Sequence, residues 1–413
     1  MSQVPAASRR ASTISPEIII LCGCLIALLT FGPRSAVGAF QRDMLVTNGW
    51  TRDIFSFGIA IQNLMWGVGQ PFAGAMADRF GALRVLWAGA LMYAAGLALM
   101  AYASTPIGWD VVGILTGLGL SGCSFNLVLG AFGKLLPENR RSLAFGFGTA
   151  AGSFGQFLFS PLSVAMIDSA GWQNTTLIFA VMMLAIFPLS LALATPTMNN
   201  GAGTLPGGGP QSLKGALSEA FGHRSYVLLV LGFFTCGFQL AFVTAHFQIY
   251  LTDKGLTPQI GGWAFALIGI FNIAGSLTAG WLGNKVPRRY VLSAIYLGRS
   301  LATIAFLSLP VSTASALAFG AISGLLWLST VPPTSSLVSL MFGTRYFAML
   351  YGFAFFSHQV GGFLGVLLGG VLYEKTGSYD VVWWLSIALG VVSALINLPI
   401  VEKPVMRAGM VAA

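Results

Sequence analysis

Twelve apolar stretches, each about twenty residues long, alternate with short polar segments along the chain. An α-helix rises about 1.5 Å per residue, so about twenty apolar residues span the hydrocarbon core of a bilayer. The pattern therefore predicts twelve membrane-spanning helices. We expect them over residues 18–40, 54–76, 83–103, 110–133, 141–166, 173–194, 225–251, 260–283, 290–309, 314–337, 345–372 and 379–401.

A polar segment after the sixth stretch divides the chain into two similar runs. From Asn199 to Pro210 it consists mainly of Gly, Pro and Asn, which is typical of a flexible linker. We therefore expect an all-α membrane protein whose twelve transmembrane helices form two six-helix bundles. The predicted parts are a cytoplasmic tail (1–17), the first bundle (18–194), a cytoplasmic linker (195–222), the second bundle (223–402) and a second cytoplasmic tail (403–413).

The composition agrees with a bilayer as the solvent. Hydrophobic residues make up 56% of the chain and charged residues 8%, whereas soluble domains carry about 25% charged residues. Continuous apolar stretches favour helices over a β-barrel, whose strands would alternate. The composition thus excludes an ordinary water-soluble enzyme.

The net charge of +9 comes from basic residues in alternate loops. They are Arg9, Arg10, Arg79, Arg84, Lys134, Arg140, Arg141, Lys214, Arg224, Lys285, Arg288, Arg289, Arg345, Lys403 and Arg407. This distribution follows the positive-inside rule and predicts cytoplasmic termini. It indicates a multi-pass protein of the cell membrane, the inner membrane if the source is bacterial, rather than a nucleic-acid-binding protein.

Motifs for cofactor chemistry are absent from the sequence. The four cysteines, Cys22, Cys24, Cys123 and Cys236, lie inside apolar stretches without the spacing of a metal site. No phosphate-binding Gly-x-x-x-x-Gly-Lys motif occurs, which argues against an ATP-driven pump. We expect no enzyme activity, no cofactor and no metal.

Two arginines lie within apolar stretches, whereas all twelve acidic residues lie outside them. A buried charge without a partner is costly, and an anionic substrate can supply the missing counter-charge. Arg34, directly after Pro33, is the stronger candidate for binding this anion; the alternative is an arginine that reaches outward or pairs with an acid. Arg299 either contacts substrate or donates to carbonyls of the seventh or eighth helix.

Other polar side chains within the apolar stretches are candidates for the same site. Histidine exchanges protons near neutral pH, so His246 and His358 are candidates for carrying a coupled proton, and His358 also for binding substrate. Asn126 and Gln156 are candidate substrate ligands among the amides. The alternative for each is a hydrogen bond between helices.

The polar stretch Gly74–Arg84 (GAMADRFGALR) returns in looser form at Gly280–Arg289 (GWLGNKVPRR), which indicates an internal repeat. The first copy resembles the loop between spans 2 and 3 of the major facilitator superfamily. The resemblance implies a binding site near mid-membrane between two bundles. It also implies that Asp78, Arg79 and Arg84 make contacts that gate the conformational change.

A second stretch narrows the resemblance. Arg140–Gly155 is similar to the span 5 signature of the monocarboxylate transporter family, and the oxalate–formate exchangers are similar in layout. The resemblance implies transport of small organic anions and places Asn126 and His358 on helices that border the cavity. Ser276 stands where these carriers have an arginine in span 8, so Arg34 or Arg299 would supply the positive charge.

We therefore expect a monomeric secondary transporter that moves a small organic anion, monocarboxylate-like, by alternating access, coupled to a proton or to anion exchange. The alternatives are a carrier of a larger aromatic or vitamin-like solute, an exporter of neutral or amphipathic compounds, and a sensor that transports nothing. The expected partners are the organic anion, a proton in the case of proton coupling, and the lipid bilayer, with no nucleic acid.

Overall fold

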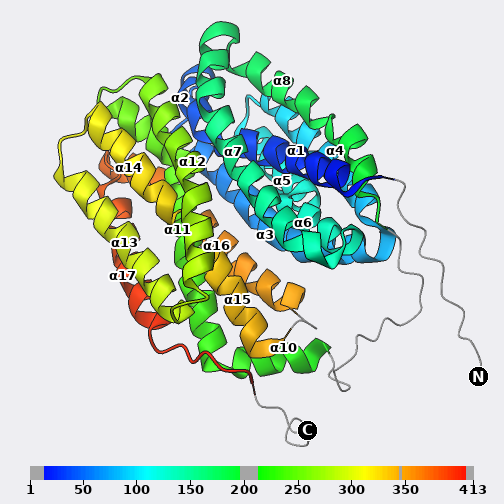
Figure 1. Cartoon of the computed structure of the whole chain (residues 1–413). Coiled ribbons are helices and arrows are strands. Elements are labelled where there is room, and N and C mark those ends of the chain that lie inside the picture. Colours follow the sequence, from blue (N-terminus) through cyan, green and yellow to red (C-terminus); the bar gives the residue numbers. More distant parts are fainter. Residues whose placement is uncertain (1–13, 196–212, 344–346, 406–413) are drawn as a thin grey trace, which may run out of the picture.

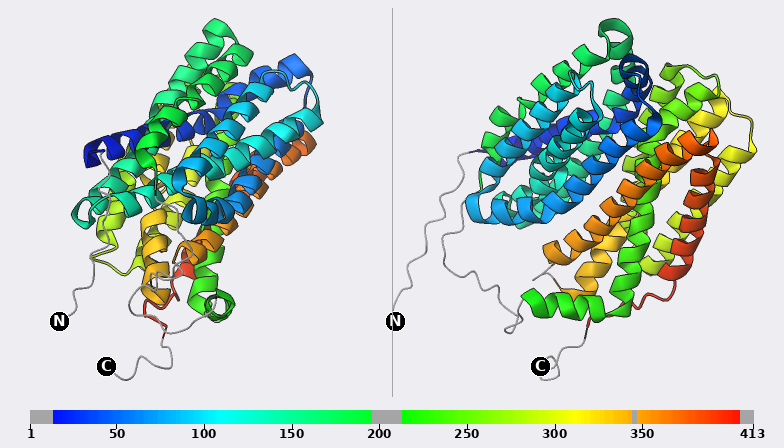
Figure 2. Two further views of the ribbon diagram at one scale, coloured as in Figure 1. Left: turned by 90° about the vertical axis from the view of Figure 1, so that its right-hand side faces the viewer. Right: turned by 180° about the vertical axis from the view of Figure 1, so that it is seen from behind.

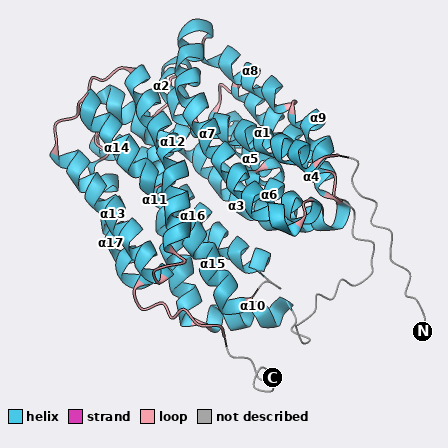
Figure 3. Cartoon of the chain, viewed as in Figure 1, coloured by secondary structure: helices cyan, strands magenta, loops and turns pink. Residues whose placement is uncertain are grey.

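The computed structural model describes residues 14–195, 213–343 and 347–405, and all regular elements within them are helices (Figures 1 and 3). The first half contains α1 (Pro16–Ser35), α2 (Val37–Asn48), α3 (Arg52–Phe80), α4 (Ala82–Met100), α5 (Pro106–Cys123), α6 (Phe125–Leu135), α7 (Glu138–Ala170), α8 (Trp172–Met183), α9 (Ile186–Ser190) and the 3-10 helix η1 (Leu191–Leu193). The second half contains α10 (Leu213–Gly222), α11 (Arg224–Asp253), α12 (Pro258–Leu282), α13 (Arg288–Ser308), α14 (Thr313–Leu326), α15 (Val331–Phe342), α16 (Phe347–Thr376) and α17 (Asp380–Asn397).

Within the described residues, eleven helical segments are long and apolar enough to cross a membrane. The helix α3 is not among them because it carries Gln62, Asn63 and Gln70 in its apolar stretch. Its 29 residues are nevertheless long enough to span a bilayer. With α3 counted, the predicted all-α fold of twelve transmembrane helices is confirmed.

Most predicted span boundaries differ from the structure by a few residues, and two of the differences concern the site. The first stretch does not end at residue 40, because α2 continues to Asn48. The polar stretch Gly74–Arg84 is not an extended loop, because α3 continues to Phe80 and α4 begins at Ala82. Gly81 alone makes the turn, with a φ of 85° that favours glycine. Polar residues at the end of a spanning helix thus remain helical.

Several spans consist of two consecutive helices. The first is divided at Ala36 between α1 and α2, the fourth at Ser124 between α5 and α6, and the tenth between Leu326 and Val331. A break in a spanning helix leaves backbone groups that need other partners. The apolar pattern gave no sign of these breaks, since hydropathy continues through them.

Buried apolar residues form two large clusters, one mainly from residues 19–193 and one mainly from residues 220–400. The two halves meet where α3 packs on α16 and α7 packs on α12. We call the end of the molecule that carries α10 the linker end, and the opposite end, with the turns at Gly49 and Gly377, the far end. In Figure 2 the ribbons of the two halves lie close at the far end and diverge toward the linker end.

Small residues permit the close contact between halves. A Cβ atom at Gly362 of α16 would lie 3.6 Å from Cβ of Asn63 on α3, and one at Gly269 of α12 would lie 2.6 Å from the Phe157 nitrogen on α7. The second distance is too short for any side chain at Gly269. Glycine therefore allows α12 to contact the α7 backbone directly.

Candidate functional site

Arg34 lies at the division of the first span. Pro33 removes one backbone hydrogen bond inside α1, and α1 ends two residues later at Ser35. The Ser35 hydroxyl donates to the carbonyls of Phe31 and Gly32, both at 2.8 Å, and so satisfies acceptors near the break. This local geometry places Arg34 between α1 and α3.

The Arg34 guanidinium contacts two side chains of α3. Its Nη2 donates to Oδ1 of Asn63 at 3.1 Å, and its Cζ lies 4.6 Å from the centre of the Trp66 ring. The Asn63 amide is oriented by donating to the Ile59 carbonyl, and the Trp66 indole by donating to Gln70. Arg34 neither reaches outward nor meets a carboxylate in these contacts, so its charge is held by an amide and a ring.

Trp66 connects this arginine to the other half. Its ring meets Phe355 of α16 at a centroid distance of 5.4 Å and 72°, and Phe355 stacks on His358 at 5.7 Å and 5°. His358 Nδ1 lies 3.0 Å from Oε1 of its neighbour Gln359. Arg34 and His358 thus stand at the two ends of one row of contacts that crosses the boundary between the halves.

The buried N–H groups without a hydrogen-bond partner among the described residues include Arg34 Nε on α1, Gln156 Nε2 on α7 and Gln359 Nε2 on α16. Gln359 packs against Gly67 of α3, next to Trp66. Gln156 lies on α7 next to Gly155. Gly155 packs directly against the Leu28 backbone of α1. A buried donor without an acceptor is unfavourable, so these groups can accept a ligand that supplies oxygen atoms.

Asn126 is partly exposed in the first turn of α6, just after the break in the fourth span. The preceding Ser124 donates its hydroxyl to Oε1 of Gln70, the same amide oxygen that receives the Trp66 indole N–H. The ring centre of Phe125, the residue directly before Asn126, lies 5.5 Å from that of Phe31 on α1. The break in the fourth span is therefore linked to the helix that holds Arg34.

Arg299 donates hydrogen bonds to backbone carbonyls at the break in the tenth span. Its Nε and Nη2 donate to the Leu326 carbonyl at 2.9 and 2.6 Å, and Nη2 also donates to the Trp327 carbonyl. Its Nη1 lies 3.4 Å from Oε1 of Gln239. The carbonyl acceptors therefore belong to the tenth span, not to the seventh or eighth as the sequence suggested. A cation at the carboxyl end of α14 also complements the helix dipole.

Asn272 of α12 holds the other side of the same break. Its Oδ1 accepts from the Leu328 backbone N–H at 2.9 Å, while its Nδ2 donates to the Ser153 hydroxyl of α7 at 2.9 Å. Ser276, where the related carriers have an arginine, donates to Oδ1 of Asn272 at 3.1 Å. One amide therefore connects the broken tenth span to the opposite half.

His246 is completely buried at the far end, away from Arg34. Its Nε2 lies 2.9 Å from the Val366 carbonyl and its Nδ1 3.2 Å from the Tyr379 hydroxyl, with Ser56 of α3 at 3.5 Å. Ser56 precedes Trp66 by ten residues, which corresponds to about 15 Å of helix. The structure therefore places the two intramembrane histidines at different depths.

The far end also holds contacts that the sequence analysis missed. Arg52, at the start of α3, donates from Nη1 and Nη2 to both oxygens of Asp253 at 2.7 and 2.8 Å, and from Nη1 to the Tyr379 hydroxyl at 2.8 Å. Its backbone N–H donates to Glu374, and its Cζ lies 3.7 Å from the Tyr373 ring centre. The sequence did contain a signal for this contact. Arg52 lies just before the second apolar stretch and Asp253 just after the seventh, so opposite charges lie at the same membrane side in the two halves.

The three residues predicted to gate the conformational change lie at the linker end. The side chain of Asp78 lies outside the described residues. Arg79 is exposed with its Cζ 5.2 Å from the Phe80 ring, and Arg84 is exposed at the start of α4. Their gating role stays a prediction, because it concerns contacts in another conformation.

Comparison with known proteins identifies the kind of molecule to which this architecture belongs. The sequence profile of the Major Facilitator Superfamily matches residues 23–366 and 247–409. The chain is 28% identical over 365 residues to the uncharacterized MFS-type transporter YcxA of Bacillus subtilis, covering 85% of this chain and 87% of that protein. It is 25% identical over 376 residues to monocarboxylate transporter 13 of Rattus norvegicus, covering 88% and 83%.

Solved structures share the fold. A bacterial homologue of the lysosomal transporter Spinster, in an inward-facing and unoccupied conformation, superposes with a TM-score of 0.71 at 14% identity, covering 94% of this chain and 95% of that one. A D-xylose–proton symporter superposes with a TM-score of 0.70 at 18% identity, covering 94% and 98%. At these identities the similarity concerns the fold.

Proposed function

The chain belongs to the Major Facilitator Superfamily, and from this premise we propose that it carries a small organic anion of the monocarboxylate type by alternating access. The observation that carries the proposal is an excess of buried hydrogen-bond donors: Arg34 Nε on α1, Gln156 Nε2 on α7 and Gln359 Nε2 on α16 have no acceptor among the described residues. A multi-pass transporter needs a site that both halves can reach, and Arg34 is linked to the second half through Trp66 and Phe355.

The donor excess favours an anion over a cation or a neutral solute. The guanidinium of Arg34 stays charged in a protein, and its Nε has no acceptor among the described residues. Gln156 and Gln359 add two more donors without acceptors. Within the described residues, the carboxylates that pair with arginines lie at or beyond helix ends: Glu17, Asp253 and Glu402. A carboxylate substrate offers acceptor oxygens for several N–H groups at once.

The contacts between the halves support alternating access. The far end is joined by Arg52 and Asp253, while the ribbons diverge toward the linker end (Figure 2). In the opposite state these far-end contacts break, and Asp78, Arg79 and Arg84 approach the other half. The charge distribution supports cytoplasmic termini, so we assign the linker end, where the ribbons diverge, to the cytoplasmic side.

Coupling to a proton is assigned to His358. It lies in the row of contacts that begins at Arg34, and imidazole titrates near neutral pH. Exchange against a second anion would need no titrating group. The names of relatives support carboxylate transport, since monocarboxylate transporters 11, 12 and 13 are similar to this chain along most of its length.

Ligand-induced thermal stabilisation of the purified protein tests the proposal. A ligand that binds the folded state raises its stability by about 2.7 kcal/mol at a hundred times its Kd. The panel contains short mono- and dicarboxylates, their neutral amides and organic cations. We expect the carboxylates to stabilise the wild type and Arg42→Gln, an exposed arginine of α2, but not Arg34→Gln. Equal stabilisation by neutral amides, unchanged in Arg34→Gln, would contradict an anion carrier.

A further inference from the structure

The residues around Arg34 also indicate what the body of the anion looks like, an inference that rests on the proposed function. Four rings form a connected group beside the guanidinium: Phe31 and Trp66, which contact Arg34, and Phe125 and Phe355, which contact those two rings. We call them the aromatic cluster. Phe31 lies 6.1 Å from Trp66 and 5.5 Å from Phe125, and Trp66 lies 5.4 Å from Phe355. Their three contacts are all edge-to-face, at 72–75°.

The aromatic cluster is assembled from four helices and both halves. Phe31 comes from α1, Trp66 from α3 and Phe125 from α6, while Phe355 comes from α16 of the second half. Trp66 and Phe355 are 3% and 8% exposed, so they already cover each other. Phe31 and Phe125 remain partly exposed. The cluster therefore keeps free aromatic surface on one side, and that side belongs to the half that holds Arg34.

The free surface lies next to the unpaired charge. Arg34 Cζ is 5.9 Å from the Phe31 ring centre and 4.6 Å from the Trp66 ring centre. The guanidinium presents N–H groups at its edge, and a carboxylate binds there in its plane. A carboxylate with only a methyl group would leave the exposed parts of Phe31 and Phe125 uncovered. A flat ring attached to the carboxylate would cover them, and ring pairs add attraction beyond their buried area.

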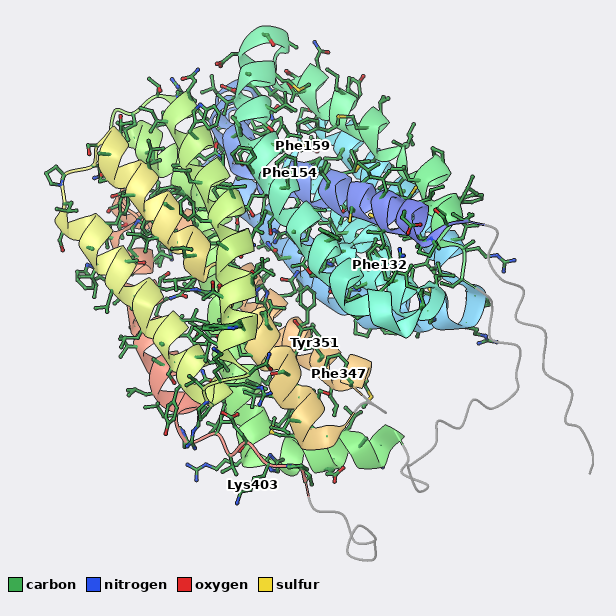
Figure 4. The ribbon with its side chains drawn as sticks, viewed as in Figure 1. Phe132, Phe154, Phe159, Phe347, Tyr351 and Lys403 are labelled. Atoms are coloured by element: carbon green, nitrogen blue, oxygen red, sulfur yellow. The ribbon has the colours of Figure 1, made fainter. Side chains whose placement is uncertain are left out.

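We propose that the transported anion is an aromatic monocarboxylate, whose carboxylate binds Arg34 and whose ring packs on Phe31 and Phe125. Phe355 packs on Trp66 from the second half, so the second half contacts the substrate site through Trp66. Phe347 and Tyr351 lie further along α16 toward the linker end, where Figure 4 labels them, and stack with each other at 5.8 Å. They extend the aromatic lining along the side from which a cytoplasmic ligand approaches.

The test compares ligands that carry a carboxylate, a flat ring, or both. Benzoate carries both, acetate only the charge, benzyl alcohol only the ring, and cyclohexanecarboxylate has a ring that is not flat. Binding is measured by isothermal titration calorimetry on purified wild type, Phe31→Leu, Phe125→Leu and Phe154→Leu. Phe154 is an exposed ring of α7 outside the aromatic cluster and serves as the matched control (Figure 4).

We expect benzoate to bind the wild type and Phe154→Leu at least tenfold more tightly than acetate or cyclohexanecarboxylate. In Phe31→Leu or Phe125→Leu we expect this preference to fall below threefold while the affinity for acetate is unchanged. A variant that has misfolded is recognised because it no longer binds acetate. Equal affinity for benzoate and cyclohexanecarboxylate, or for benzoate and acetate, overturns the aromatic substrate and leaves the anion carrier intact. Benzyl alcohol binding as well as benzoate, also in Arg34→Gln, overturns the anion carrier itself.

Discussion

Arg52 and Asp253 join the two halves at the far end through a pair of parallel hydrogen bonds of 2.7 and 2.8 Å. The pair connects the start of α3 to the end of α11, 201 residues apart in sequence. Its side chains are 12% and 31% exposed, so water screens it only in part. A two-pronged arginine–carboxylate pair is stronger than an ordinary surface pair, and it joins the two halves at this end.

Neutralising this pair is expected to favour opening of the far end. Hydrogen bonds to charged groups contribute about 1.5–3 kcal/mol, and partial exposure reduces this to about 1 kcal/mol, a roughly fivefold shift in the equilibrium. Spin labels on the far-end turns, read by double electron–electron resonance, would show longer distances in Asp253→Asn. The charge-swapped double variant Arg52→Asp/Asp253→Arg should restore the wild-type distribution. Unchanged distances in Asp253→Asn would show that other contacts hold the far end.

Arg299 is expected to stabilise the fold rather than to bind substrate. Replacing it with leucine leaves the carbonyls of Leu326 and Trp327 buried without a donor, at about 1–3 kcal/mol each. We expect Arg299→Leu to unfold several degrees lower in a thermal melt, and Arg299→Lys to recover part of the loss. The Kd for carboxylates in the folded fraction should stay within twofold of wild type; a tenfold weaker Kd at unchanged stability would make Arg299 a ligand.

Variants of Asn272 and Ser153 are expected to affect two different quantities, the free energy of unfolding and the distance between the halves. Asn272→Leu removes the acceptor for the Leu328 N–H and is expected to cost about 1–3 kcal/mol of unfolding free energy. Ser153→Ala removes only the acceptor across the halves and leaves the Leu328 N–H paired, so the melting temperature should fall less than in Asn272→Leu while the distances between the halves lengthen. Melting curves and distance measurements on both variants test this. Equal loss of stability in the two variants would contradict the distinction.

His358 and His246 are expected to differ in proton coupling. His358→Gln cannot titrate, so uptake driven by a proton gradient should fall at least tenfold in proteoliposomes while counterflow exchange persists. His246→Gln, whose site at the far end is filled by Val366 and Tyr379, should keep gradient-driven uptake and lose thermal stability. The reverse outcome would place the coupling group at the far end.

The fold could be predicted from the sequence because a bilayer imposes a local requirement. Each span must be apolar over about twenty residues, and that requirement is visible in any window of the chain. The same reasoning found Arg34 and Arg299, since a cation in an apolar stretch stands out without knowledge of its neighbours. The breaks near Ser124 and Trp327 escaped it, because apolar residues continue through both.

What the sequence by itself determined is the number of spans, their order and the few polar side chains that lie among them. Only the tertiary structure decided their partners: Asn63 and Trp66 for Arg34, the tenth-span carbonyls for Arg299, and Asp253 for Arg52. Hydropathy reports the medium that surrounds a residue, and this medium is the same for every helix in a bilayer. Pairing depends on which helices pack together and at which depth, and that follows from close contacts between glycines and backbones far apart in the chain.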